Sequence, residues 1–154
     1  MSEDQTRALT VPQRHEDFYK RLRSRVRRWF EAGGKSAPWA DYVLLAPDLF
    51  HLMCRLMVDR DVPRAQKARL ATAIAYFISP VDLLPEAVLG PVGLLDDVVL
   101  AAYVLHQVVN HTEPAVLRRH WAGGQDVLAL VQEILRRADE IVGERLWRRV
   151  KRLL

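Results

Sequence analysis

The chain has 154 residues, a formal net charge of +4, one cysteine and 50% apolar residues. This length suits one domain with a substantial core, and the apolar content excludes disorder as the general state of the chain. A single cysteine excludes an internal disulfide and a zinc site made of cysteines, which suits a reducing cytoplasm. We expect Cys54 to be a buried apolar residue, and a nucleophile pair with His51 is the alternative.

Apolar residues recur at helical spacing, and no useful run alternates with the period of two that strands show. We therefore predict an all-α fold, a compact helical bundle. Residues 1–13 are polar, lack the apolar segment of a signal peptide and are expected to form a flexible tail. Residues 14–154 are expected to form a single helical domain.

The first helix is predicted over residues 14–32, because apolar residues recur on one face and basic residues occupy the others. It ends at two glycines. The residues proposed to contact a partner are Arg21, Arg25, Arg28 and Trp29. Two interpretations of the apolar stripe remain open: it enters a lipid interface, or it closes the core through Phe18, Leu22 and Val26.

The next segments predict a core helix and a helical hairpin. Residues 38–59 are expected to form one helix, or a pair broken at Pro47, because proline is unfavourable inside a helix. A third helix begins at Pro63, and residues 94–111 are apolar on nearly all sides, as in the middle helix of a bundle. We expect residues 64–111 to form a central apolar hairpin. The apolar stripe of the third helix contains Leu70, Ile74 and Phe77.

The turn of this hairpin contains the best defined motif of the chain. Its residues are Ser79, Pro80, Asp82, Pro85, Gly93, Asp96 and Asp97. In a structural interpretation, the two prolines stop the preceding helix, Asp82 accepts backbone N–H groups, and Gly93 suits a positive φ. Asp96 and Asp97 would then lie in the first turn of the next helix, where negative charge is favourable.

The alternative interpretation of the turn is a metal site. Asp82, Glu86, Asp96 and Asp97 would converge on a divalent cation, since Mg²⁺, Mn²⁺ and Ca²⁺ prefer carboxylate oxygens. This is also the only enzymatic hypothesis that the sequence supports, a metal-dependent hydrolytic site. We expect no catalytic residues and no cofactor, because the chain lacks a phosphate-binding glycine loop and a nucleophile elbow.

At the same residues the sequence resembles the YkvA-like family, a bacterial helical-hairpin domain of unknown function. The matching positions are Ser79, Pro80, Asp82, Pro85, Gly93, Asp96 and Asp97. Glu86 departs from the family, which usually has aspartate after the second proline. The resemblance covers about residues 65–105 and implies a helical hairpin and, for some members, association with membranes.

A membrane span is not predicted. The longest uncharged run, residues 98–112, is shorter than the roughly 20 apolar residues that a spanning helix requires. A buried hairpin is therefore favoured. A shallow re-entrant hairpin is the alternative, because residues 70–112 contain only four charged residues, all at the turn.

The C-terminal part predicts a short helix over residues 114–121 and a last helix from Gln125. The final segment, residues 144–154, is the second basic amphipathic element. Its proposed contact residues are Trp147, Arg148, Arg149 and Arg152. His106 and His111 are five positions apart, so we expect them not to form a metal-binding pair.

The charge distribution suggests a binding function. Residues 40–112 contain five basic and eight acidic residues, so the positive excess lies in the two flanks. We expect a non-enzymatic interaction module, cytoplasmic or peripheral at the inner membrane, that binds a protein partner or an anionic membrane surface. Binding of nucleic acid through the arginine-rich helices is the alternative, although no recognised nucleic-acid motif is present.

Overall fold

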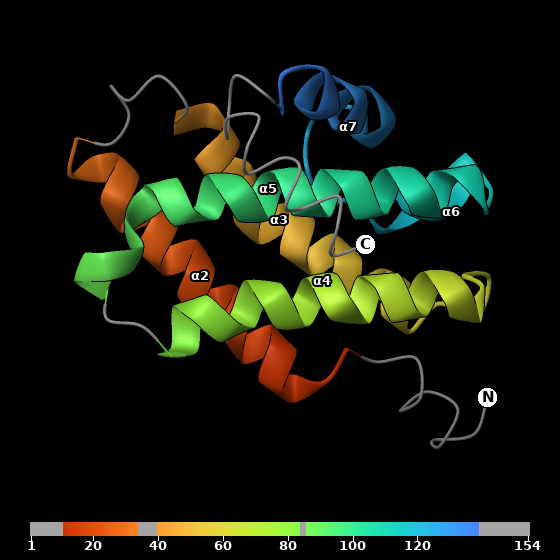
Figure 1. Ribbon diagram of the computed structural model, residues 1–154, viewed down its shortest axis with the longest axis horizontal. Coiled ribbons are helices and arrows are strands. Elements are labelled where there is room, and N and C mark those ends of the chain that lie inside the picture. The colour runs from red at the N-terminus through yellow and green to blue at the C-terminus, as the bar shows by residue number, and fades with distance from the viewer. Residues whose placement is uncertain (1–10, 34–39, 84–85, 139–154) are drawn as a thin grey trace.

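The computed structural model describes residues 11–33, 40–83 and 86–138, and for residues 79–83 and 86–96 the backbone alone. These ranges contain helices and no strand, which confirms the all-α fold. The helices are α2 (Gln13–Glu31), α3 (Ala40–Met57), α4 (Arg64–Leu83), α5 (Glu86–Asn110), α6 (Pro114–His120) and α7 (Val127–Arg136). Figure 1 shows them packed into one bundle.

The predicted hairpin lies at the centre of this bundle. Helices α4 and α5 run in opposite directions beside each other, and α5 also packs against α3 and α7. Because α5 has neighbours on several sides, the apolar residues of its part after Asp96 are buried on most sides, as expected for a middle helix. The fully or nearly fully buried ones are Val98, Val99, Leu100, Ala101, Ala102, Val104, Leu105 and Val108.

Three phenylalanines join the N-terminal helices to the hairpin. Phe50 of α3 has its ring centroid 4.7 Å from that of Phe18 in α2 and 5.4 Å from that of Phe77 in α4. All three side chains are at most 2% exposed. Tilted aromatic pairs at these separations add to the stabilisation from burial. The stripes predicted from the sequence on α2 and α4 thus meet on one residue of α3.

Helix α3 is continuous through Pro47, so of the two alternatives the single helix is confirmed and the broken pair is wrong. Proline inside a helix removes one backbone hydrogen bond and costs about 3 kcal/mol or more. Buried residues lie on both sides of it in the chain, among them Val43, Ala46, Leu49 and Phe50. Burial of this apolar surface outweighs the local cost, since each fully buried large side chain contributes about 1.5–3 kcal/mol.

The hairpin turn is also shorter than the sequence suggested. Helix α4 continues through Pro80 to Leu83, and α5 begins at Glu86, which leaves only residues 84–85 between them. Pro80 lies in the last turn of α4, and the helix ends three residues after this proline instead of before it. Ser79, Pro80 and Asp82 therefore belong to α4, while Gly93, Asp96 and Asp97 belong to α5, and Pro85 lies outside the described residues.

A tight loop connects α6 to α7 through two glycines with different surroundings. The indole N–H of Trp121 donates to the carbonyl oxygen of Gln125, at 2.7 Å, and the ring covers Gly123. A Cβ at Gly123 would overlap this ring, whereas a Cβ at Gly124 would meet no atom within 4 Å. The hydrogen bond and the partial burial of the ring against the core prevent it from moving away freely.

We expect Gly123→Ala to lower the free energy of unfolding by about 1–3 kcal/mol, the usual range for overpacking. The matched control is Gly124→Ala, which should be neutral or stabilise by up to about 1 kcal/mol through the unfolded state. Urea unfolding of both variants measures the difference. Equal stability of the two would show that the Trp121 ring yields without cost.

Candidate functional site

Helix α2 has two chemically opposite sides. Phe18, Leu22 and Val26 are at most 3% exposed and pack into the core, so the interpretation that this stripe closes the core is confirmed. The other sides carry a set of basic residues that we call the α2 basic face: Lys20, Arg21, Arg23, Arg25, Arg27 and Arg28. No acidic residue interrupts it between Asp17 and Glu31.

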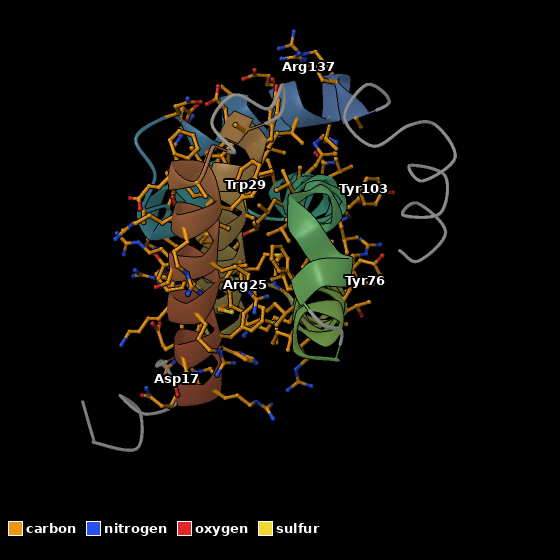
Figure 2. The ribbon with its side chains drawn as sticks, turned by 90° about the vertical axis from the view of Figure 1, so that its left-hand side faces the viewer. Asp17, Arg25, Trp29, Tyr76, Tyr103 and Arg137 are labelled. Atoms are coloured by element: carbon orange, nitrogen blue, oxygen red, sulfur yellow. The ribbon has the colours of Figure 1, made fainter. Side chains whose placement is uncertain are left out.

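The α2 basic face lies at the edge of the bundle. Figure 2 shows α2 on one side of the molecule, with Arg25 on it, and Tyr76 and Tyr103 on the opposite side. Arg25 is half-buried, and all other members of the face are exposed. Long cationic side chains on an outer helix, with their stems along the protein and their heads in water, create a local positive potential.

Contacts with α3 hold α2 in this orientation. The Nε2 atom of His51 lies 3.5 Å from Oε1 of Glu16, and the ring of Tyr19 stacks on the imidazole of His51 with centroids 4.6 Å apart. Together with the pair of Phe18 and Phe50, these contacts fix the rotation of α2 about its own axis. The basic face therefore points away from the core.

The predicted contact residues divide into three groups. Arg21 and Arg28 are exposed, as a contact surface requires. Arg25 is half-buried, and Trp29 is partly buried against the core. The second basic element, with Trp147, Arg148, Arg149 and Arg152, lies outside the described residues. Within the described part of the chain, the candidate binding surface is therefore the α2 basic face.

A polar cluster that the sequence did not suggest connects the turn between α3 and α4 to the end of α6. Oδ2 of Asp59 accepts hydrogen bonds from Arg119 at 2.9 Å and from Nε2 of His120 at 2.5 Å. Arg119 also donates to Asp61 at 2.7 Å, and the backbone N–H of Asp61 donates to Oδ1 of Asp59 at 2.8 Å. We call these four residues the Asp59 cluster.

The electrostatics of the Asp59 cluster favour the ionised carboxylate. Burial of Asp59, whose side chain is 8% exposed, raises its pKa. The hydrogen bonds from His120, from the backbone of Asp61 and from Arg119 outweigh burial, so the pKa of Asp59 is lowered. Hydrogen bonds to a charged group are stronger than those between neutral groups. The cluster thus stabilises the contact between two distant segments.

An aspartate next to a histidine is also part of many catalytic triads, but this pair has no access to a substrate. Nδ1 of His120, the nitrogen that faces away from Asp59, is buried and has no hydrogen-bond partner among the described residues. A general base must reach the proton that it removes. The geometry therefore assigns the Asp59 cluster to structure rather than to catalysis.

A second polar contact joins α3 to α7. The hydroxyl of Tyr42 donates to Oε1 of Glu133 at 3.2 Å and accepts from Nη1 of Arg137 at 2.8 Å. The guanidinium carbon of Arg137 lies 5.6 Å from the centroid of the Tyr42 ring. Burial and the charge of Glu133 raise the pKa of Tyr42. The neutral phenol thus serves both as donor and as acceptor in this contact.

Cys54 is buried, as predicted, with 1% of its surface exposed. Burial, with a smaller effect from the charge of Glu16, raises the pKa of its thiol to about 12. The nucleophile in cysteine chemistry is the thiolate, and at neutral pH this residue remains a thiol. His51 contacts Glu16 and Tyr19, so the alternative of a Cys54 and His51 nucleophile pair finds no support.

Helix α5 changes the interpretation of the turn carboxylates. Asp96 and Asp97 are the eleventh and twelfth residues of α5, so the prediction that they occupy a first turn is wrong. Gly93 is helical instead of having a positive φ. Asp97 is 4% exposed.

The side chains of Asp82, Glu86 and Asp96 lie outside the described residues, so the hypothesis that these three and Asp97 bind one divalent cation stays a prediction. No group of three or more metal ligands occurs in the part of the chain that the structure describes. His106 and His111 make separate contacts, with Asn110 and with the carbonyl oxygen of Gln107.

Helix length and apolarity also bear on the membrane hypothesis. Within the ranges described, no helix combines the length and the apolar character needed to cross a membrane.

Comparison with known proteins finds one family and one relative, both without an assigned function. Over 105 residues the chain is 25% identical to "Uncharacterized protein ORF9" of Methanothermobacter thermautotrophicus, an alignment that covers 68% of this chain and 72% of that protein. No solved structure matches the present chain. Residues 66–103, which include most of the central hairpin, match the family described as "Protein of unknown function (DUF1232)".

Proposed function

We propose that this protein is a YkvA-like helical module without catalytic activity, which attaches to an anionic membrane surface through the α2 basic face. The observation that carries the proposal is the division of α2. Phe18, Leu22 and Val26 of its apolar stripe are buried in the core, while an uninterrupted set of basic side chains lies on its other sides. Such a face meets lipid headgroups without inserting into the bilayer.

The magnitude of the attraction supports a reversible attachment. Each basic residue close to an anionic leaflet contributes about 1 kcal/mol. Lys20, Arg23, Arg27 and Arg28 are exposed, and together they would contribute about 4 kcal/mol, or about three powers of ten in partitioning. The attraction falls within a Debye length, about 8 Å at physiological salt. Binding should therefore be peripheral and sensitive to salt.

A lipid surface fits this face better than a protein partner does. The cores of protein interfaces are depleted of charged residues and enriched in aromatic anchors. On α2, Phe18 and Leu22 are buried in the core, and Trp29 is partly buried against it. Headgroups need only positive charge on an accessible surface, which the α2 basic face provides.

We expect replacement of Lys20, Arg23, Arg27 and Arg28 by glutamine to reduce binding to vesicles that contain phosphatidylglycerol by at least about tenfold, because the local potential is removed. The matched control replaces Arg60, Arg64, Lys67 and Arg136, basic residues outside α2, by glutamine. Both variants change the formal net charge from +4 to 0. Sedimentation with vesicles, and with phosphatidylcholine vesicles as the uncharged reference, measures binding.

The outcomes separate the alternatives. Equal loss in both variants would mean that total charge matters and that α2 is not the contact surface. Absence of vesicle binding, with tight and salt-sensitive binding to duplex DNA, would replace the membrane by nucleic acid. Far-ultraviolet circular dichroism checks that each variant keeps its helices.

A further inference from the structure

Ser24 lies at the centre of the α2 basic face. On a helix, the side-chain neighbours of a residue are those three and four positions away. For Ser24 these neighbours include Lys20 on one side and Arg27 and Arg28 on the other. Ser24 is exposed, and its hydroxyl makes no hydrogen bond within the described residues, in contrast to Thr72 on α4, which donates to the carbonyl oxygen of Ala68 at 3.0 Å.

This placement surrounds a hydroxyl donor with cations. Side chains at these spacings have Cβ atoms about 5–6 Å apart, and their flexible ends reach a group bound above Ser24. Arginine provides planar paired donors for phosphate oxygens, and lysine provides a compact charge. A hydroxyl between them offers one further hydrogen bond that is independent of charge.

We propose that Ser24, Lys20, Arg27 and Arg28 form a subsite for the phosphate monoester of a lipid headgroup, of which phosphatidic acid is the simplest example. This inference rests on the proposed function and adds a preference among anionic lipids. A phosphate monoester carries about −1.5 to −2 charges at pH 7 and three acceptor oxygens. A phosphodiester headgroup carries a single charge, so it gains less from converging cations and a hydroxyl donor.

The test compares two kinds of vesicle with the same surface potential. One contains phosphatidic acid and the other phosphatidylglycerol, each in phosphatidylcholine, with their proportions adjusted until the zeta potentials agree. We expect the whole chain to bind the phosphatidic acid vesicles about fivefold more tightly, a factor typical of one added hydrogen bond. Equal affinity of the unaltered protein for both vesicles would overturn the subsite and leave the proposed function standing.

Ser24→Ala removes the hydroxyl without changing any charge, and alanine is a good helix former. It should abolish the preference for phosphatidic acid and leave binding to phosphatidylglycerol unchanged. Ser24→Thr, which restores a hydroxyl, should recover the preference, and Thr72→Ala, the loss of an exposed hydroxyl on α4, should leave it intact. A preference that persists in Ser24→Ala would exclude Ser24 from the subsite.

Two further outcomes show whether the phosphate belongs to a lipid or is free, and whether membrane binding itself occurs. Inorganic phosphate at 10 mM and constant ionic strength, the added competitor, should not release the protein from phosphatidic acid vesicles. Release would assign the subsite to free phosphate and overturn the lipid assignment. Binding to neither anionic vesicle would overturn the proposed function and this inference together.

Discussion

Replacement of Phe50 by alanine should lower the free energy of unfolding by about 4 kcal/mol, within the range of about 3–5 kcal/mol for buried aromatic residues. Phe50 is 0% exposed and its ring contacts those of Phe18 and Phe77. The substitution leaves a cavity where α2, α3 and α4 meet. For a chain of this size, the change corresponds to a fall of about 8–16 °C in the melting temperature.

Phe30→Ala is the control for this prediction, because Phe30 near the end of α2 is only half-buried. Its replacement should lower the free energy of unfolding by about 1 kcal/mol or less. Thermal and urea unfolding, followed by circular dichroism, compare the two variants. A loss at Phe50 no greater than that at Phe30 would contradict the role of Phe50 as the junction of three helices.

Replacement of Asp59 by alanine should lower the free energy of unfolding by about 2–3 kcal/mol. It removes the acceptor for Arg119, for Nε2 of His120 and for the backbone N–H of Asp61, and buried donors without acceptors are costly. Asp61→Ala is the matched control. The Asp61 side chain is 64% exposed, and exposed ion pairs contribute only about 0–1 kcal/mol.

The carboxylate of Asp59 should also make the free energy of unfolding depend on pH. The folded protein holds the Asp59 proton less tightly than the unfolded chain does, because the pKa of Asp59 is lowered in the fold. Its contribution to stability is therefore present above about pH 5 and is lost as the pH falls through the folded pKa. Asp59→Asn should show a shallower loss of stability in acid than the unaltered chain. Identical slopes would mean that other carboxylates dominate acid unfolding.

The helices themselves were largely predictable. The helix predicted over residues 14–32 is α2 at Gln13–Glu31, and the stripe of Leu70, Ile74 and Phe77 is buried. These predictions succeed because the spacing of apolar residues along the chain is a local property that indicates which face of a helix is buried. The apolar residues on all sides of α5 likewise predicted its central place.

The predictions that failed depended on prolines. Local rules place a helix end at Pro47 and at Pro80, yet α3 continues through the first and α4 extends to Leu83 beyond the second. At Pro47 the burial of neighbouring residues outweighs the cost of a lost hydrogen bond. The assignment of Asp96 and Asp97 to a first turn was also wrong, because α5 begins at Glu86, ten residues before Asp96.

The candidate binding surface was partly predictable. The basic residues of α2 are visible in the sequence, but whether Phe18, Leu22 and Val26 face lipid or the core depends on a partner helix. The structure supplies α3 as that partner. Contact between Asp59 and His120, 61 positions apart, has no local signal at all.

By itself, the sequence determined the all-α class, the amphipathic character of α2 and the central place of the hairpin, because periodicity and composition are carried by neighbouring residues. Only the tertiary structure decided where the prolines are tolerated, which side of α2 stays exposed, and that Asp59, Arg119 and His120 meet. Those outcomes depend on free energies of packing between segments far apart in the chain, which no local pattern contains.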